Sequence, residues 1–443
     1  MARSWTGFIW SKYVSRYNFK SKKYIEKMKM LDKFNLLFDW NRFTLISVCI
    51  LAFCVSLGAA TVSLAKALVL ACLLSQLFLN KRKNFEFKLV QVPSIFIWMF
   101  FALIWMLISM SWSQATDRVQ WQYLYGHTRF LWIGAIYFLI RTKDRALSAL
   151  KWLIYGQVFV VALSWVMWLG MDTPFTRRPL EKGIAFTSTL EQPVMTVLAL
   201  IALWVFRDYW KKLWGNWFVP LAIAAMALNI VFVMSGRTGY LVFLLFITIE
   251  IFRWLPTRWR LMAILSPVIL VVIFYVVSPV FSKRVGEIVT NSQAYLQKES
   301  LSSEGERLDM WKHTISGILK RPIQGYGVGS MPELYKEEGG LIKGDLSQPH
   351  QQYLFWWAEF GLIGLVIMLG FFFVVIKDSL LLDSKAKLSL QSVTAVLFVM
   401  GLFNCPFFGV GMGEFFFLEI AALLAIKGNA SNICTSGNIR HAY

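Results

Sequence analysis

A histidine, a glutamine and two glycines have types and spacing that suit proton transfer beside a membrane. Pro349-His350-Gln351 opens an apolar run, and Gly361 and Gly364 follow within it. Proline suits the first position of a helix, so the sequence predicts that His350 lies in the first turn of a membrane helix. There the helix dipole favours a neutral imidazole, which can accept a proton. Eleven residues at about 100° each would bring Gly361 onto the same face, where glycines admit a close neighbour.

Arg237 is a candidate for binding a phosphate. It lies in segment 235–240, Ser-Gly-Arg-Thr-Gly-Tyr, between two apolar runs. The glycines let the backbone turn sharply, so the segment predicts a guanidinium presented to a cavity on the outer side of the membrane. A guanidinium is a fork of donors that matches phosphate better than an ammonium does. The alternative is an arginine that reaches lipid headgroups.

Arg307 is the second candidate. Residues 303–306 have the spacing of a capping box, which predicts a helix that begins there and ends before Pro322. Arg307 is one turn before Trp311, so both should face the protein. The alternative is an arginine that is solvated or paired with a nearby carboxylate. On the same helix we expect His313 to be exposed and inert.

Two further features accompany these residues. The three alternating glycines of segment 325–329 indicate an irregular backbone. Neither a helix start nor a Lys-Ser pair follows them, so they do not predict a nucleotide loop. Arg129 opens another apolar run at the outer side, and we take it, with Gln351, as a substrate-binding candidate.

Composition places these residues in a polytopic membrane protein. The chain has 443 residues, of which 57% are hydrophobic and 16% charged, whereas soluble domains carry about 25% charged residues. Apolar runs of membrane-spanning length recur. They predict an all-α bundle of about twelve spans, near residues 43–60, 62–79, 92–111, 128–140, 146–170, 192–206, 217–235, 238–252, 261–278, 351–376, 388–403 and 415–427.

The positive charge predicts the orientation of the bundle. With the N-terminus inside, 29 Lys and Arg fall on the inner side and 15 on the outer side. The net charge of +20 therefore reflects basic loops at the membrane and does not indicate nucleic acid. The predicted organisation is a basic inner tail over 1–42, nine spans over 43–278, a large periplasmic loop with helices over 279–350, three spans over 351–427 and an inner tail over 428–443.

Metal and thiol chemistry have no support in the pattern. The five cysteines lack the spacing of a metal site or a disulfide framework, and no paired carboxylate motif is present. We therefore expect neither a metal nor a cofactor.

Together these motifs resemble those of the O-antigen ligase family. The family pattern of His, then Asn, Ser or Gln, nine residues and Gly-x-x-Gly is found here as His350-Gln351 and Gly361 to Gly364. Ser-Gly-Arg at 235–237, Arg307 with Trp311, and Gly-Tyr-Gly at 325–327 agree with it. The resemblance covers about residues 217–376 and extends to a superfamily of O-antigen polymerases and protein O-oligosaccharyltransferases.

The resemblance implies a metal-independent, GT-C-like glycosyltransferase of the bacterial inner membrane, with its active site facing the periplasm. The donor would be a glycan on undecaprenyl diphosphate and the acceptor lipid A–core, with membrane lipids around the protein. Arg237 and Arg307 would bind the diphosphate and stabilise the leaving group, and His350 would be the general base. A polymerase or a protein O-oligosaccharyltransferase remains an alternative. A lipid-linked glycan transporter is the alternative from another class, and it would need ionisable groups at mid-membrane.

Overall fold

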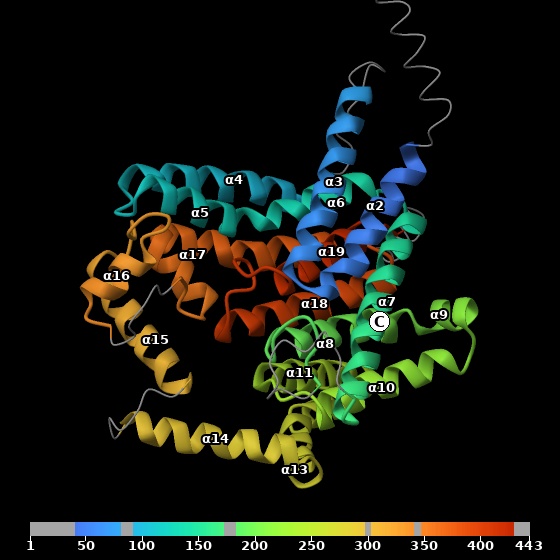
Figure 1. The fold of residues 1–443 in the computed structure, drawn as a ribbon. Helices are drawn as coiled ribbons and strands as arrows, with labels where there is room; N and C mark the ends of the chain where they lie inside the picture. The colour runs from blue at the N-terminus through green and yellow to red at the C-terminus, as the bar shows by residue number, and fades with distance from the viewer. Residues whose placement is uncertain (1–39, 81–91, 172–182, 297–302, 341–346, 429–443) are drawn as a thin grey trace, which may run out of the picture.

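The structure is a computed structural model that describes residues 40–80, 92–171, 183–296, 303–340 and 347–428 (Figure 1). The described residues form helices and no strand, and the isolated bridge residues include the pair Leu382 and Lys427. The predicted all-α architecture is therefore confirmed for this part of the chain. Most of the two predicted inner tails lies outside the described residues.

A helix occupies each of the twelve apolar segments predicted from the sequence. They are α2 (Trp40–Cys54), α3 (Ala59–Asn80), α4 (Ser94–Ser109), α6 (Leu131–Leu139), α7 (Lys143–Trp168), α8 (Glu191–Val205), α10 (Phe218–Phe232), α11 (Arg237–Trp254), α13 (Ser266–Val277), α17 (Gln352–Ser379), α18 (Ser384–Phe403) and α19 (Met412–Leu424).

Fewer of these helices meet the length that a membrane crossing needs. Among the described residues, six are long and apolar enough, or up to eight if two bent helix pairs each form one span. α6, α10, α11 and α19 are outside this set, and the physical reason is clear for two of them. α6 has only 9 residues, and all of α19 is buried inside the protein. An apolar run such as α19 marks a protein interior as readily as a lipid-facing span, so the twelve-span topology stays a prediction.

α4 and α17 pack along each other and form the frame that carries the site (Figure 1). At one end the Asp378 carboxylate accepts hydrogen bonds from the backbone N–H groups of Ser94 and Ile95, both at 2.9 Å. It thereby satisfies two of the unpaired donors at the N-terminus of α4. Near the other end Trp105 donates its indole N–H to the Phe360 carbonyl at 3.0 Å.

The predicted outer loop is largely helical where it is described. α14 (Pro279–Leu296), α15 (Ser303–Lys320) and α16 (Met331–Glu337) lie to one side of the bundle (Figure 1). α15 begins at the predicted capping box and ends before Pro322, as expected. The expectation for His313 is wrong, because the side chain is buried, with Nδ1 2.8 Å from the Asp309 carbonyl and the ring against Tyr335.

Cysteine labelling tests the orientation. On a cysteine-free background, Lys312→Cys should react with a membrane-impermeant maleimide added outside, because the positive-inside pattern predicts that α15 lies in the periplasm. Ser384→Cys, at the exposed start of α18, should react only after permeabilisation. The reverse pattern would contradict the predicted topology.

Candidate functional site

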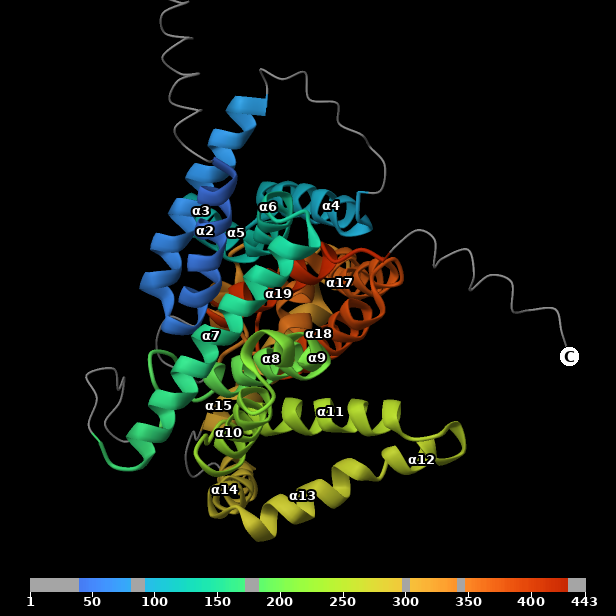
Figure 2. The ribbon, with the colours of Figure 1, turned by 90° about the vertical axis from the view of Figure 1, so that its right-hand side faces the viewer.

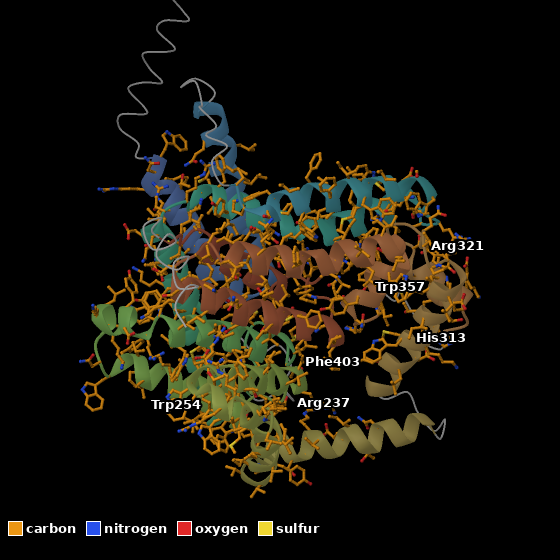
Figure 3. The ribbon with its side chains drawn as sticks, turned by 180° about the vertical axis from the view of Figure 1, so that it is seen from behind. Arg237, Trp254, His313, Arg321, Trp357 and Phe403 are labelled. Atoms are coloured by element: carbon orange, nitrogen blue, oxygen red, sulfur yellow. The ribbon has the colours of Figure 1, made fainter. Side chains whose placement is uncertain are left out.

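Arg237 and Arg307 line a single pocket, although 70 residues separate them in the chain. The pocket has a volume of about 400 Å³ and lies where the start of α11 meets α14, α15 and the end of α18. Figure 3 shows Arg237 and Phe403 at this place. The remaining lining residues are Thr238, Leu241, Ile288, Leu308, Trp311 and Phe403. The two predicted phosphate-binding residues are thus brought together in a pocket that is otherwise mostly apolar.

The pocket carries an excess of positive charge. Arg237 donates to the Glu287 carboxylate at 3.1 Å, and Arg284 donates to the same carboxylate oxygen at 2.9 Å. Burial raises the pKa of Glu287, but the two guanidinium groups more than offset this, and the pKa lies below its ordinary value. Glu287 is therefore ionised and shared between two arginines.

Arg307 has no hydrogen bond or ion pair to any other described residue. Burial first, and the Arg237 guanidinium second, lower its pKa, although an arginine keeps its charge at any physiological pH. A half-buried guanidinium that shares a pocket with a second guanidinium is a candidate site for an anion. A phosphate between Arg237 and Arg307 would relieve the repulsion and supply the missing acceptors.

His350 adjoins this pocket through two of its lining residues. The indole N–H of Trp311 donates to the Pro349 carbonyl at 3.0 Å. Phe403 is followed by Asn404, whose side-chain oxygen is 3.4 Å from His350 Nδ1. Burial and the Arg307 guanidinium lower the pKa of His350 against the opposing effect of Asn404. The ring is therefore neutral at pH 7.

The backbone around His350 differs from the prediction. α17 begins at Gln352, and Gln351 is its N-cap, with the side-chain oxygen accepting from the Leu354 N–H at 2.5 Å. His350 precedes the helix with φ at 51°, a left-handed conformation that L side chains rarely adopt. The predicted first-turn position of His350 is thus wrong. Burial and Arg307, and not the helix dipole, favour its neutral ring.

Asn404 sets the tautomer of His350, and the sequence analysis missed it. Its side-chain oxygen also accepts the Cys405 N–H at 3.1 Å, which fixes the orientation of the amide. His350 Nδ1 must then be the donor to Asn404, which leaves the lone pair on Nε2. No described residue is a hydrogen-bond partner of Nε2. A polar residue directly after the apolar run 388–403 was the available signal.

Gly361 breaks α17 and does not face a neighbouring helix as we expected. Its φ and ψ are 68° and −169°, and the Leu362 N–H donates to the Pro322 carbonyl at 2.9 Å, outside the helix. A Cβ at Gly361 would lie 1.9 Å from the Ile323 carbonyl oxygen. Only a glycine at position 361 therefore leaves room for the backbone that follows α15.

The backbone of segment 325–329, which contains three alternating glycines, packs against the break in α17. All three glycines have positive φ, which confirms the predicted irregular backbone. The N–H groups of Tyr326 and Gly327 donate to the Ala358 and Glu359 carbonyls at 2.9 and 2.8 Å. They satisfy carbonyls that the break leaves without helical partners. The end of α15 is thereby tied to the middle of α17, which fixes Arg307 relative to His350.

Most of this arrangement lies within one matched segment, and Phe403 and Asn404 lie beyond its end. Residues 221–369 match the family model described as O-Antigen ligase. The chain carries an O-antigen ligase family domain. No curated protein matches the chain. The ligase-family segment contains Arg237, Arg307, His350 and the break at Gly361. The apolar helices of the described residues indicate a multi-pass membrane protein.

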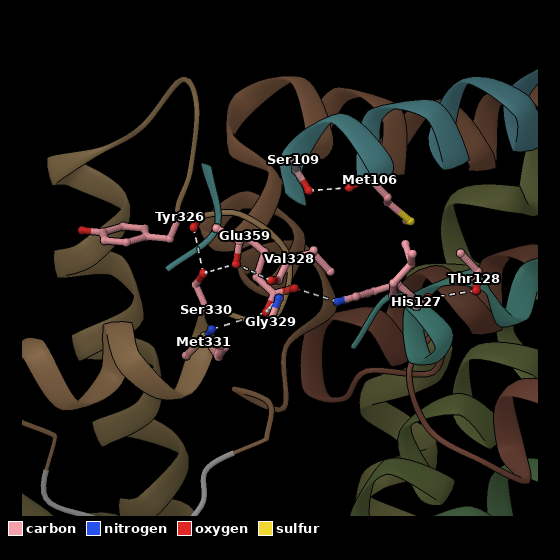
Figure 4. Close-up of polar contacts among 12 residues, drawn as sticks. Met106, Ser109, His127, Thr128, Tyr326, Val328, Gly329, Ser330, Met331 and Glu359 are labelled. Carbon is pink, nitrogen blue, oxygen red and sulfur yellow. Dashed lines mark hydrogen bonds and ion pairs between the residues drawn. The ribbon is translucent and has the colours of Figure 1, made fainter. Parts of the chain in front are cut away.

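A buried polar contact between His127 and Glu359 supports the ligase-family segment from α5 (Asp117–His127), a helix that lies outside that segment. His127 Nε2 is 2.8 Å from a Glu359 carboxylate oxygen, and both side chains are fully buried (Figure 4). The other carboxylate oxygen accepts the N–H groups of Gly329 and Met331 at 3.0 and 3.3 Å. The sequence analysis missed Glu359, although a single carboxylate within an apolar run is a signal for a buried polar network.

The substrate-binding candidates Arg129 and Gln351 contact residues outside the pocket of Arg237 and Arg307. Arg129 donates to the Phe408 carbonyl at 2.5 Å and lies 3.9 Å from the Glu414 carboxylate, which also pairs with Lys66 at 3.0 Å. Gln351 caps α17. Neither residue lines the pocket of Arg237 and Arg307.

The described residues were also compared with the requirements of a metal site. Within them no group of three His, Cys, Asp or Glu side chains could hold a metal ion. Cys49, Cys54, Cys72 and Cys405 are free thiols.

Proposed function

We propose that the protein is an inner-membrane glycosyltransferase that transfers O-antigen polysaccharide from undecaprenyl diphosphate to lipid A–core on the periplasmic side. One observation carries the proposal: Arg237 and Arg307 line the same pocket, and His350 adjoins it. All three residues lie within the ligase-family segment.

The arginines would bind the donor diphosphate. Guanidinium groups form bidentate, charge-assisted hydrogen bonds to phosphate oxygens. Their charge stabilises the negative charge that develops on the diphosphate as the glycosidic bond breaks. The apolar walls of the pocket, such as Leu241 and Ile288, suit the first isoprene units of the lipid.

His350 would activate the acceptor. Its Nε2 accepts the proton of the acceptor hydroxyl while that oxygen bonds to the anomeric carbon of the donor. The bond from this carbon to the diphosphate breaks, and its electron pair leaves with the diphosphate oxygen. Because one displacement occurs, the configuration at the anomeric carbon inverts. General base catalysis of this kind contributes about 10²–10⁴-fold.

The proposal is tested by incubating the purified protein with undecaprenyl-diphosphate-linked glycan and lipid A–core. A product of lipid A–core mass plus glycan supports it. Parallel reactions contain a second lipid-linked glycan or a protein acceptor in place of lipid A–core. Transfer only to the lipid-linked glycan or only to protein would assign the chain to polymerisation or protein glycosylation and contradict the proposal.

Transfer should not depend on a divalent metal. Two guanidinium groups already supply the positive charge that a metal would bring to the diphosphate. In the same assay, 5 mM EDTA should therefore leave the initial rate within about twofold. Loss of activity with EDTA, together with recovery on addition of Mg²⁺ or Mn²⁺, would show that the arginines are not sufficient.

A further inference from the structure

A second pocket lies along α11, far from the arginine pocket. Its volume is about 590 Å³, and it lies between α8, α10 and α11, which pack together (Figure 2). Most of its wall is apolar. The lining residues are Leu200, Trp204, Arg207, Ile223, Ala227, Phe243, Phe246, Ile247, Glu250, Ile251, Arg253 and Trp254.

The two pockets use opposite faces of α11. Thr238 and Leu241 line the first pocket, whereas Ile247 and Trp254 line the second. At about 100° per residue, the mean directions of the two sets of lining residues differ by roughly 170°. Figure 3 shows Arg237 and Trp254 at the two ends of the helix. A lipid tail that enters beside Arg237 therefore does not continue into the second pocket along α11.

The second pocket has one polar end, and that end carries an unbalanced positive charge. The Glu250 carboxylate accepts from the Trp204 indole at 2.8 Å and from Arg253 at 2.7 Å, so Arg253 is neutralised. Arg207 lies over the Trp204 ring at 4.7 Å and donates to the Trp204 carbonyl. No described carboxylate pairs with Arg207.

The polar end lies where a membrane surface is expected. At Arg207 the chain bends by 83° from α8 into α9 (Arg207–Trp214). α9 buries Trp210 and carries Lys211 and Lys212, a pattern typical of a helix that lies along a bilayer surface. Trp254 is 84% exposed, and exposed tryptophans gather at the headgroup level. The nearby basic segments 207–212 and 253–260 belong to the side with more Lys and Arg, where anionic lipids also lie.

We propose that this groove binds one anionic glycerophospholipid, with an acyl chain between α10 and α11 and the headgroup phosphate at Arg207. The apolar wall suits an acyl chain, and the single excess charge matches a single phosphodiester. A zwitterionic lipid also carries an ammonium group, which has no free carboxylate to meet among the described residues at this end, because Glu250 is already paired. This inference is independent of the proposed glycosyl transfer.

Native mass spectrometry of the purified protein tests the proposal. Phosphatidylglycerol should bind with a stoichiometry of one and about tenfold more tightly than phosphatidylcholine of the same chains. Arg207→Gln should remove this difference, and Arg207→Lys should keep part of it. Ala227→Phe should weaken both lipids, because the new ring fills the groove. Arg258→Gln, outside the groove, is the matched control and should change nothing.

Three outcomes would overturn the proposal. The first is equal affinity for the two lipids. The second is a loss of the preference for phosphatidylglycerol in Arg258→Gln that is as large as the loss in Arg207→Gln. The third is displacement of phosphatidylglycerol by undecaprenyl phosphate at equimolar concentration. The last outcome would assign the groove to the polyprenyl carrier. Thermal melting of each variant shows that it is folded, and the two substitutions at Arg207 and the one at Ala227 keep the test independent of any single variant.

Discussion

His350→Asn should reduce glycan transfer by about 10²–10⁴-fold while donor binding persists. The imidazole is the only group that we assign to proton removal, whereas we assign the arginines to diphosphate binding. Asparagine is the better replacement because it tolerates the positive φ at this position, 51°, more readily than alanine does. Single-turnover rates, with the protein in excess over the donor, measure the loss in the chemical step, and binding of the lipid-linked donor is measured separately on the same preparation.

The pH dependence supplies the control for this prediction. Burial and the Arg307 guanidinium hold the pKa of His350 below its usual value of about 6.5. A group with a lowered pKa stays neutral until the pH falls below that range, so the wild-type single-turnover rate should decline only on the acid side of about pH 6.5. Arg307→Ala removes one cause of the lowering, and its residual activity should decline at a higher pH. Near-full transfer by His350→Asn would refute the base assignment.

Arg307→Ala should reduce kcat/KM by about 10²–10³-fold and weaken donor binding as well. The diphosphate is present in both the ground state and the transition state, so both lose the guanidinium. Arg237→Lys should also be poor, because an ammonium keeps the charge but loses the paired hydrogen bonds. Steady-state kinetics with varied donor concentration separate the two effects.

Arg284→Ala is the matched control for these arginines. Arg284 contacts the same Glu287 carboxylate as Arg237 but does not line the pocket. The Arg284→Ala substitution changes the net charge by the same amount as Arg307→Ala. If it reduced activity as much as Arg307→Ala does, the loss would indicate a general electrostatic effect and not a direct contact with the diphosphate.

Local patterns predicted a good part of this site. The capping-box sequence pattern that starts at Ser303 and the later Pro322 predicted the bounds of α15, because both signals act within one helical turn. One turn of helix separates Arg307 from Trp311, so both reach the same pocket. The glycines of segment 325–329 require an irregular backbone wherever they lie. Such signals depend on neighbouring residues and are readable from sequence.

Contacts between distant segments were not predictable in the same way. The start of α17 depends on Trp311, 38 residues away, which holds the Pro349 carbonyl. Glu359 contacts His127, which lies 232 residues earlier in the chain. Hydropathy also cannot separate α19, which is buried in protein, from a helix that faces lipid. Each of these features depends on packing between segments that are far apart in the chain. A single sequence does not show which distant segments are in contact.

The two guanidinium groups of the pocket also have a consequence for turnover. In the proposed reaction they bind the diphosphate, which is common to the donor and to the spent carrier. On leaving the sugar the diphosphate gains a negative charge, so the pocket holds the spent carrier more firmly than the donor. Release of undecaprenyl diphosphate, rather than bond formation, should then limit the steady-state rate. Sustained transfer would depend on a phosphatase that hydrolyses the spent carrier, and added undecaprenyl diphosphate would act as a competitive inhibitor.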